Sequence, residues 1–279
     1  MPFTQIAPAD PNVSLFPGSP IVLGGAKLMM FGLKQETVWS VAAQLPSGAW
    51  SSLGSLGVRF LEKFGLVAIG SGFFVLGGQS AQAEATIYAS PDGITWDLVT
   101  PNAPFGPRYS MCALNYNGAM YVFAGRNATD ACNDVWICTG GEMAWKQLTA
   151  HAPFPPTEQA GCASFAGGMF LLGGLSDHVA TNQVWASYDG ATWYNFGPAP
   201  WPGRYQPAVA VAGNALYVMG GSGNDGNTLM DIWVTTTGKS WTQVDNFEPG
   251  VVNAIPPTAT SDGVTIYVGS QGGIWAGLP

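Results

Sequence analysis

Charged residues are scarce in this chain of 279 residues. Only 9% of them are Asp, Glu, Lys or Arg, against roughly 25% in an average soluble protein. Basic residues are the scarcer kind, with 9 Lys and Arg against 17 Asp and Glu, and they form no run anywhere. The net charge of -8 argues against nucleic acids and anionic membranes as partners, because both require clustered Lys and Arg.

Long hydrophobic runs are also missing. The longest apolar run, 65–78, is too short and too rich in Gly to span a membrane. The N-terminus, MPFTQIAPADP, has neither the basic start nor the apolar core of a secretory signal. We therefore expect a soluble protein without membrane insertion, either cytoplasmic or placed in a virion or outside the cell by a non-classical route. The sequence leaves its oligomeric state open.

Cysteine is rare, and its spacing indicates no metal or redox site. No CxxC pair occurs among the four cysteines, which are Cys112, Cys132, Cys138 and Cys162. We expect them to act as small, buried apolar residues. A bridge between Cys132 and Cys138 stays an open alternative.

Histidine is rarer still, with only His151 and His178 in the whole chain. Two histidines in predicted loops are too few to indicate a metal site, so we expect no metal and no cofactor. The loop Ser222–Thr228 (SGNDGNT) offers oxygen ligands for Ca²⁺ but lacks a terminal bidentate Glu, and we expect a turn there instead.

An internal repeat dominates what the sequence does contain. One unit, Arg108–Thr149, holds four strand-like segments in which β-branched and aromatic residues alternate with others and Gly or Asn form the boundaries. No stretch has a helical period, and 47% of the residues are hydrophobic, which is enough for a core. The glycine that ends the second segment recurs every 46 to 49 residues, as Gly32, Gly78, Gly125, Gly174, Gly221 and Gly269.

Aromatic residues follow the same pitch. The third segments carry Trp39, Tyr88, Trp136, Trp185, Trp233 and Trp275, and the fourth carry Trp50, Trp96, Trp145, Trp193 and Trp241. Four strands per unit at this period indicate the blades of a β-propeller. We expect the aromatic rings to fill the space between adjacent twisted sheets and the paired glycines to let neighbouring backbones approach closely.

The unit resembles the kelch repeat. The matching features are the double glycines at Gly77–Gly78, Gly173–Gly174 and Gly220–Gly221, the segments MYVFAG and LYVMGG, the NDVW at Asn133–Trp136, and the Trp of the fourth segment. The resemblance covers essentially the whole chain. The first unit departs from it with a single Gly32, and the second has Tyr88 in place of Trp. Kelch propellers commonly bind partners around the channel mouth, so the resemblance implies a site there without naming the ligand.

The predicted fold is a single all-β domain over 1–279, a six-bladed β-propeller with four-stranded antiparallel blades. Its blades cover about 13–53, 58–100, 107–149, 156–197, 204–245, and 252–279 together with 1–7. Only five fourth segments follow the six third segments. Because Phe3–Ile6 (FTQI) resembles Trp241–Val244 (WTQV), we expect the N-terminal strand to complete the last blade and close the ring.

The phrase APFGPR, Ala103–Arg108, recurs as APFPPT and APWPGR at the repeat pitch. It lies between two blades, on the face that surrounds the channel mouth, and its prolines suit a boundary between sheets. Arg flanked by aromatic residues is typical of binding sites. The candidate ligand-binding residues are Arg59, Phe105, Arg108, Tyr109, His151, Phe154, Glu158, Trp201, Arg204 and Tyr205.

A structural interpretation competes with this one. The arginines can satisfy backbone carbonyls of an adjoining blade, and the aromatic residues can plug the seams between blades. Blade four breaks the pattern, because Thr157 stands where blades three and five have Arg108 and Arg204.

We predict a non-enzymatic binding or structural propeller that recognises a protein or a glycan at the channel mouth. Its weakly charged surface, rich in Gly, Thr and Asn, favours a virion component such as a phage tail-associated protein, or an adhesin-like domain. Two alternatives stay open, an enzyme that resembles sialate epimerases and an intracellular peptide-binding scaffold. Such an epimerase would use Arg for the carboxylate and Glu or His as the base, roles that Arg108, Arg204, Glu158 and His151 could imitate.

Two further features carry no catalytic prediction. The kelch-type copper oxidases use a set of Tyr, His and Cys that this chain does not match. The turns SPDGITW and SYDGATW, at Ser90–Trp96 and Ser187–Trp193, resemble shortened Asp-box turns of sialidases. We expect them to be tight hairpins on the face opposite the mouth.

Overall fold

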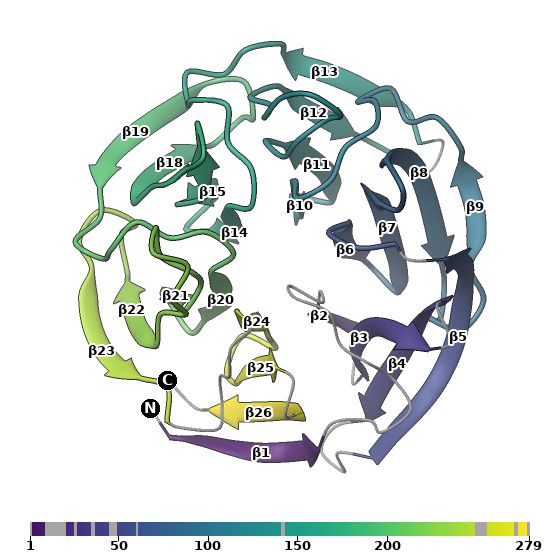
Figure 1. Cartoon of the computed structure of the whole chain (residues 1–279), viewed down its shortest axis with the longest axis horizontal. Helices are drawn as coiled ribbons and strands as arrows, with labels where there is room; N and C mark the ends of the chain where they lie inside the picture. The colour runs from purple at the N-terminus through teal and green to yellow at the C-terminus, as the bar shows by residue number, and fades with distance from the viewer. Residues whose placement is uncertain are drawn as a thin grey trace.

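The computed structural model describes residues 2–8, 21–24, 27–34, 37–44, 49–59, 61–140, 143–248, 256–270 and 273–277. These residues form six four-stranded antiparallel sheets and one two-stranded hairpin. The sheets stand side by side around a central axis (Figure 1), and their innermost strands are β2 (Ile21–Gly24), β6 (Gly65–Ile69), β10 (Cys112–Tyr116), β14 (Gly161–Phe165), β20 (Ala208–Ala212) and β24 (Thr258–Ser261). The predicted all-β propeller with four-stranded antiparallel blades is confirmed at this level.

Five sheets have their strands in chain order, although the two-stranded hairpin interrupts the fourth of them, and the sixth sheet combines the N-terminal strand with the last three strands. The sheets, which we call blades 1 to 5 in chain order, are as follows. Blade 1 has β2 (Ile21–Gly24), β3 (Lys27–Lys34), β4 (Thr37–Gln44) and β5 (Ala49–Arg59). Blade 2 has β6 (Gly65–Ile69), β7 (Gly72–Gln79), β8 (Ala83–Ser90) and β9 (Asp97–Thr100). Blade 3 has β10 (Cys112–Tyr116), β11 (Ala119–Phe123), β12 (Val135–Cys138) and β13 (Trp145–Thr149).

Blade 4 has β14 (Gly161–Phe165), β15 (Gly168–Leu172), β18 (Gln183–Ser187) and β19 (Trp193–Pro198). A small hairpin of β16 (Leu175–Ser176) and β17 (Val179–Ala180) extends from it. Blade 5 has β20 (Ala208–Ala212), β21 (Ala215–Met219), β22 (Asp231–Thr235) and β23 (Thr242–Asn246). The last sheet has the order β1 (Phe3–Pro8), β26 (Gly273–Gly277), β25 (Ile266–Ser270) and β24 (Thr258–Ser261).

The core lies between neighbouring blades. The second strands β11, β15 and β25 are buried along their whole length, which explains why none of them contains a charged residue. One cluster joins Leu114 and Phe123 of blade 3 to Met169, Leu171 and Trp193 of blade 4. The aromatic residues of the repeat therefore fill the inter-blade space as predicted.

The double glycines mark the closest approach between consecutive blades. Gly78 has a φ of +117° and donates its N–H to the carbonyl of Arg108 at 2.8 Å. Gly77, with a φ of +54°, leaves no room for a Cβ beside the same carbonyl. Glycine is needed here both for the left-handed backbone and for the contact, as the repeat predicted.

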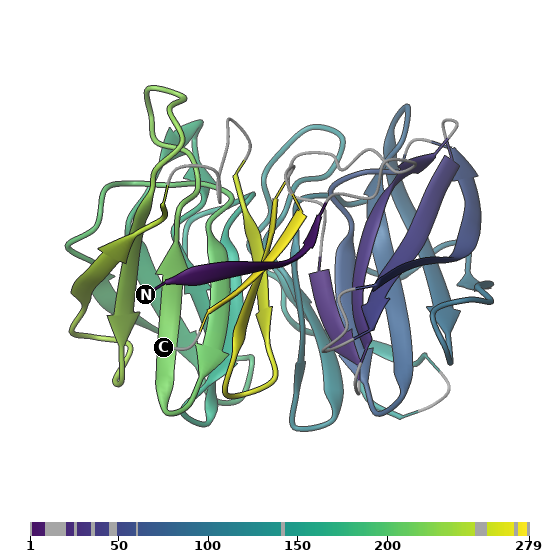
Figure 2. The same cartoon turned by 90° about the horizontal axis from the view of Figure 1, so that it is seen from below.

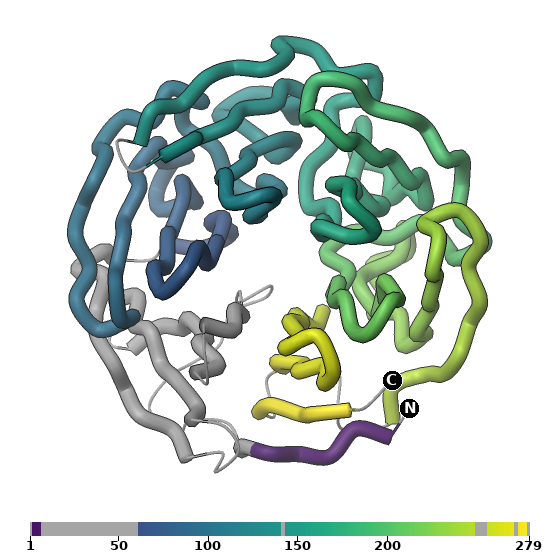
Figure 3. Tube along the Cα trace, turned by 180° about the vertical axis from the view of Figure 1, so that it is seen from behind, coloured from purple at the N-terminus to yellow at the C-terminus, as the bar shows by residue number. Residues whose placement is uncertain are grey.

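The two ends of the chain share one sheet. β1 pairs antiparallel with β26, with Phe3 opposite Gly277, and lies along its outer edge in Figure 2. Seen from behind, the purple N-terminal strand runs beside the yellow C-terminal strands, and the two termini lie next to each other (Figure 3). Phe3 is buried and packs on Phe247 of the preceding connector.

All four cysteines are free thiols, so the bridge between Cys132 and Cys138 is not formed. Cys112 and Cys138 are buried, while Cys132 and Cys162 are partly buried. Burial raises the pKa of the Cys112 and Cys138 thiols, which keeps them protonated at neutral pH. Among the residues that the structure describes, no helix is both long and apolar enough to cross a lipid bilayer.

Candidate functional site

Arg108 is held inside blade 3 by a dense set of contacts. Its guanidinium forms a two-pronged ion pair with Asp134, with N···O distances of 2.7 and 2.8 Å. It also donates to the carbonyls of Ala124 at 3.2 Å and Phe105 at 3.0 Å. The residue is 3% exposed, so the guanidinium is committed to the fold and is not offered to a ligand.

Arg204 repeats this arrangement in blade 5. It pairs with both carboxylate oxygens of Asp231, at 2.8 and 2.7 Å, and donates to the carbonyl of Gly220 at 2.8 Å. Its guanidinium carbon lies 5.2 Å from the ring centroid of Trp201, and the residue is 0% exposed. Both arginines therefore have a structural role, but the competing interpretation was wrong about their partners. These are mainly a carboxylate, with carbonyls besides, and they belong to the same blade and its connector rather than to an adjoining blade.

Both aspartates are ionised because of these contacts. Burial alone would raise the pKa of the Asp134 carboxyl, but the Arg108 guanidinium and the indole N–H of Trp136 outweigh it and lower that pKa below its usual value. The pKa of Asp231 is lowered in the same way. Burial would raise it, but the Arg204 guanidinium and the indole N–H of Trp233 outweigh burial. Each pair is thus a buried charge pair inside one blade.

Arg59 is a candidate because, with Phe60, it loosely resembles the Arg-Tyr pairs of blades 3 and 5, and the blade register corrects that equivalence. Isolated β-bridges join Glu62 to Gln79, Tyr109 to Arg126, and Glu158 to Leu175. The residue before Glu62 is Leu61, which is 0% exposed and stands where the other blades have Arg108 and Thr157. Arg59 is therefore no counterpart of Arg108. It ends β5, where it pairs with Thr37, and its side chain lies outside the described residues.

The connector aromatics are buried plugs. Phe105 meets Trp145 with ring centroids 5.0 Å apart, Phe154 meets Trp193 at 5.0 Å, and Trp201 meets Trp241 at 5.9 Å. Their exposed fractions are 4%, 1% and 1%, so they seal the seams between blades and present no surface to a ligand.

Four residues from blades 2 to 5 line one side of the mouth of the central channel, and we call them the collar: Lys63, Ser110, Gln159 and Gln206. Each comes two residues after the position of Arg108 in its own blade. The N–H of Ser110 donates to the carbonyl of Lys63 at 2.7 Å, that of Gln159 to Ser110 at 3.0 Å, and that of Gln206 to Gln159 at 2.7 Å. A chain of backbone hydrogen bonds thus passes from blade to blade around the mouth.

The collar has an unusual backbone. All four residues are in the left-handed region, with φ between 51° and 56°, although none is glycine. Such a conformation costs on the order of 1–3 kcal/mol per residue and gathers at functional sites in many proteins. Blade-to-blade hydrogen bonds hold the residues in it.

Collar residues line a mouth cavity of about 150 Å³, together with Met111, Pro207 and Pro257. The hydroxyl oxygen of Ser110 is buried and has no hydrogen-bond partner among the described residues. Such an atom requires a partner, which a water or a ligand in the cavity can supply. The ammonium of Lys63 lies 3.3 Å from the amide oxygen of Gln79 and 5.6 Å from the Tyr109 ring centroid. A second cavity of about 200 Å³ lies deeper, beside Gly65, Ala113, Gly161, Cys162 and Val209.

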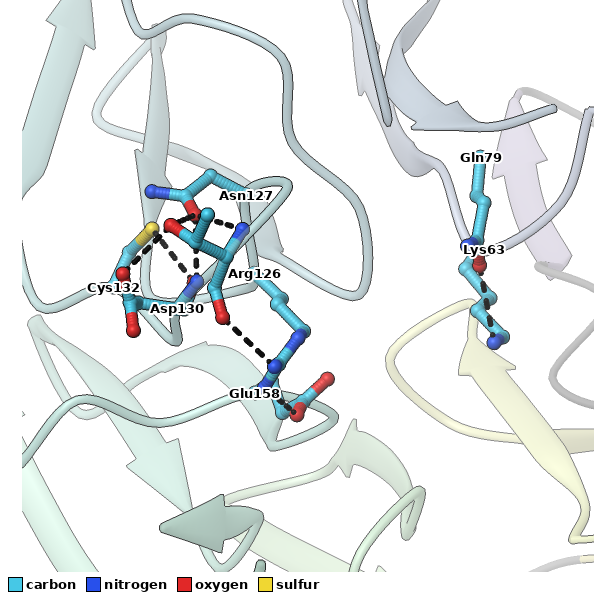
Figure 4. A network of polar contacts seen from close by, with 8 residues as sticks. Lys63, Gln79, Arg126, Asn127, Asp130, Cys132 and Glu158 are labelled. Carbon is cyan, nitrogen blue, oxygen red and sulfur yellow. Dashed lines mark hydrogen bonds and ion pairs between the residues drawn. The ribbon is translucent and has the colours of Figure 1, made fainter. Parts of the chain in front are cut away.

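A cleft of about 460 Å³ lies beside the collar, between the loops of blades 3 and 4. Arg126 and Glu158 form an ion pair across it at 3.0 Å, and Arg126 also donates to the carbonyl of Thr129 at 2.9 Å (Figure 4). Burial works to lower the pKa of Arg126, but Glu158 outweighs it and raises that pKa. His178, at the tip of the β16–β17 hairpin, lines the same cleft and is exposed.

The remaining predicted residues are dispersed. Tyr109 and Tyr205 are partly buried and pair with Arg126 and Ser222 through isolated bridges. His151 is exposed in the connector before blade 4, with its Nδ1 3.3 Å from the amide oxygen of Asn133. Of the predicted set, the cleft holds only Glu158. Within the described part of the chain no group of His, Cys, Asp and Glu could hold a metal ion.

Two predicted turns have local structural roles. The Asp92 and Asp189 carboxylates accept backbone N–H bonds inside the hairpins after β8 and β18, as expected for tight turns.

The loop Ser222–Thr228 joins two blades. Within it Asp225 bonds Asn227, and Asn224 exchanges two hydrogen bonds with the backbone of Ala180 in blade 4. That loop is a clamp between blades 4 and 5.

Comparison with known proteins agrees with the repeat. The family described as the KLHDC2/KLHL20/DRC7 Kelch-repeats domain matches residues 63–273. The chain belongs to the kelch-repeat family. A solved structure titled "Structure of YjhT" has a TM-score of 0.78 to this kelch propeller, with 15% identity over 98% of this chain and 96% of that chain. At this identity the likeness supports the fold alone. No curated protein matches the sequence.

Two parts of the candidate site could not be predicted from the kelch repeat pattern. Sequence reasoning missed Arg126, which has no counterpart in the neighbouring blades, and it missed the collar. The collar residues recur 47, 49 and 47 residues apart, so the pitch was readable, but their residue types differ from blade to blade. What makes them a set is their shared left-handed backbone, which the sequence pattern did not indicate.

Proposed function

We propose that this kelch propeller is a non-enzymatic binding module that recognises a protein segment or a glycan at the channel mouth. The collar is the observation that carries the proposal. Four polar residues from successive blades line one cavity, on a backbone held in a strained conformation, and the buried Ser110 hydroxyl has no partner among the described residues. Convergent polar groups at a preformed cavity are the usual basis of specific recognition.

The collar replaces the connector arginines as the proposed contact surface. Arg108 and Arg204 have an indirect role. Their ion pairs fix the connectors, and the collar residues Ser110 and Gln206 come two residues later in the chain. The adjacent cleft with Arg126 and Glu158 extends the surface toward blade 4. The weakly charged composition still favours a virion component or an adhesin-like domain, and an intracellular peptide-binding scaffold would use the same mouth.

We also propose that the six sheets act as the six blades of one closed domain over 1–279, with β1 as the closing strand. The pairing of β1 with β26 and the contact between Phe3 and Phe247 support this. A ring closed in this way leaves no long unpaired edge strand.

One observation favours a second candidate. Arg126, Glu158 and His178 line a single cleft, which is the kind of set that an epimerase of sugar acids would use. Incubation with sialic acid and related sugar acids, followed by NMR of the anomers, tests it. Turnover that Glu158→Gln abolishes would establish this candidate over the binding module.

The binding proposal is tested with a glycan array and a displayed peptide library. The test variant is Gln159→Ala with Gln206→Ala, which truncates two collar amides without touching the buried ion pairs. Gln147→Ala is the matched control, because Gln147 is an exposed glutamine on β13 away from the mouth. Ligands that the wild type and the control retain and the collar variant loses support the proposal. Retention of every ligand by the collar variant would refute the mouth as the site.

A further inference from the structure

Blade 4 carries two aromatic residues that the repeat does not require. Tyr188 and Tyr194 are each 51% exposed. The equivalent positions in blades 2, 3 and 5 are not aromatic; they are Pro91 and Asp97, Thr139 and Lys146, and Thr236 and Thr242. Since three other blades form without aromatic residues at these positions, the fold itself does not account for Tyr188 and Tyr194.

These residues line a groove on the outer part of the molecule, which we call the tyrosine groove: Tyr188, Tyr194, Asn195, Phe196 and Lys239. Its volume is about 490 Å³. The two tyrosine rings are inclined at 52°, with centroids 6.3 Å apart, and the ammonium of Lys239 from blade 5 lies 4.7 Å from the Phe196 centroid. The groove therefore spans the seam between blades 4 and 5.

The tyrosine groove is distinct from the channel mouth. Tyr188 and Tyr194 flank the turn that joins β18 to β19, whereas the connector toward blade 5 leaves the other end of β19. The connector and its collar residue Gln206 are thus at the opposite end of the blade. A ligand in the groove would not compete with one at the mouth.

Buried neighbours hold the groove in shape. The Tyr116 hydroxyl lies 3.1 Å from the carbonyl oxygen of Tyr188, and Phe196 packs on the buried Phe170 with centroids 5.9 Å apart. Tyr194 is fixed by its place opposite Ala186 in the β18–β19 ladder. Because buried neighbours already hold these residues in place, the groove would lose little side-chain conformational entropy when a ligand binds.

We propose that the tyrosine groove binds a neutral oligosaccharide. The C–H face of a pyranose ring is apolar and fits the face of a tyrosine, while its hydroxyl groups need polar partners around the rim. Both kinds of group are present among the lining residues, because Asn195, Lys239 and the tyrosine hydroxyls accompany the aromatic rings. The Asn195 amide oxygen already accepts the Gly197 N–H at 2.6 Å, so its NH₂ group is the part that can serve a sugar. The net charge of -8 disfavours a polyanionic glycan, and Lys239 is the one charged side chain among the lining residues.

Isothermal titration of the whole chain with malto-, cello-, xylo- and chito-oligosaccharides tests the proposal. Saturable binding of at least one series is expected. Tyr188→Ala and Tyr194→Ala should each weaken it about tenfold or more, as anchor residues do, and Tyr194→Phe should retain most of it because the ring remains. The melting temperature of each variant shows whether the fold is intact.

Leu98→Ala is the matched control, because Leu98 has the same exposed fraction of 51% on the fourth strand of blade 2. The control and the collar variant should bind the sugar as the wild type does, which separates this site from the mouth. Failure of all four series to bind would overturn the proposal, as would equal binding by the Tyr188→Ala, Tyr194→Ala double variant. A proline-rich peptide that binds through these tyrosines when the sugars do not would overturn the assignment to a glycan.

Discussion

The ring of Phe3 lies against the ring of Phe247, with 5.4 Å between centroids and an interplanar angle of 43°. In three other seams of the described part of the chain, a connector aromatic meets the tryptophan at the start of a fourth strand, as Trp201 meets Trp241. Phe3 therefore takes the place of that tryptophan, although it comes from the opposite end of the chain.

Removing this contact should open the ring. Deletion of residues 1–7, or Phe3→Ala alone, should lower the melting temperature, because truncation of a buried Phe costs about 3–5 kcal/mol and shifts a protein of this size by roughly 6–20 °C. Differential scanning calorimetry measures the shift. Phe3→Trp should be tolerated, since tryptophan fills the equivalent seams, and the exposed Thr4→Ala is the neutral control. A melt unchanged by the deletion would contradict the closing role of β1.

The buried pair of Arg108 and Asp134 gives a second prediction, because blade 4 forms without one. Thr157 and Gln183 stand at the equivalent positions there. Arg108→Thr should destabilise the protein by about 3–5 kcal/mol, since it leaves the Asp134 charge buried and unpaired. The double variant Arg108→Thr, Asp134→Gln should recover part of this loss. Denaturant unfolding measures both, and a double variant that is less stable than the single one would refute the argument.

The lowered pKa values of Asp134 and Asp231 predict that the stability of the fold depends on pH in the acidic range. Their folded pKa values are lowered, so the folded state binds fewer protons than the unfolded state, whose aspartates titrate near ~3.9. Their contribution to stability is complete above that value and is lost as the pH falls through the lowered folded pKa. The melting temperature should fall across this acidic window, and less steeply in the double variant Arg108→Thr, Asp134→Gln. Parallel curves for the two proteins would contradict the assignment.

Much of the fold was readable from the sequence because it repeats. The glycines and tryptophans recur at a constant pitch, and the backbone contacts that require them, such as Gly78 with Arg108, recur with it. The resemblance between FTQI and WTQV predicted that the N-terminal strand joins the last sheet, where β1 pairs with β26. Local composition, in contrast, misled the choice of site residues. Arg108 beside Phe105 has the composition of a binding surface, and its burial against Asp134 depends on a contact 26 residues away in sequence.

The collar could not be predicted in the same way. Its residues are Lys, Ser and Gln, which are all polar but differ in charge and in length, so no one residue type marks the position. They become equivalent through a backbone conformation set by hydrogen bonds between blades, and such contacts have no signature in the sequence of a single blade. Arg126 was missed for the related reason that its partner, Glu158, belongs to the next repeat.

The collar conformation itself gives the last prediction. Gln159 has a φ of +56°, which glycine adopts freely and a β-branched residue resists. Gln159→Val should therefore destabilise the protein by about 1–3 kcal/mol, whereas Gln159→Gly should be neutral or stabilising because it relieves the strain. Denaturant unfolding of both variants measures the difference, with Gln147→Val and Gln147→Gly as controls on the strand β13. In that extended position the order should reverse, since valine favours a strand and glycine weakens it. If valine and glycine had equal effects at Gln159, the collar backbone would not be strained, and the main support for a site at the mouth would be lost.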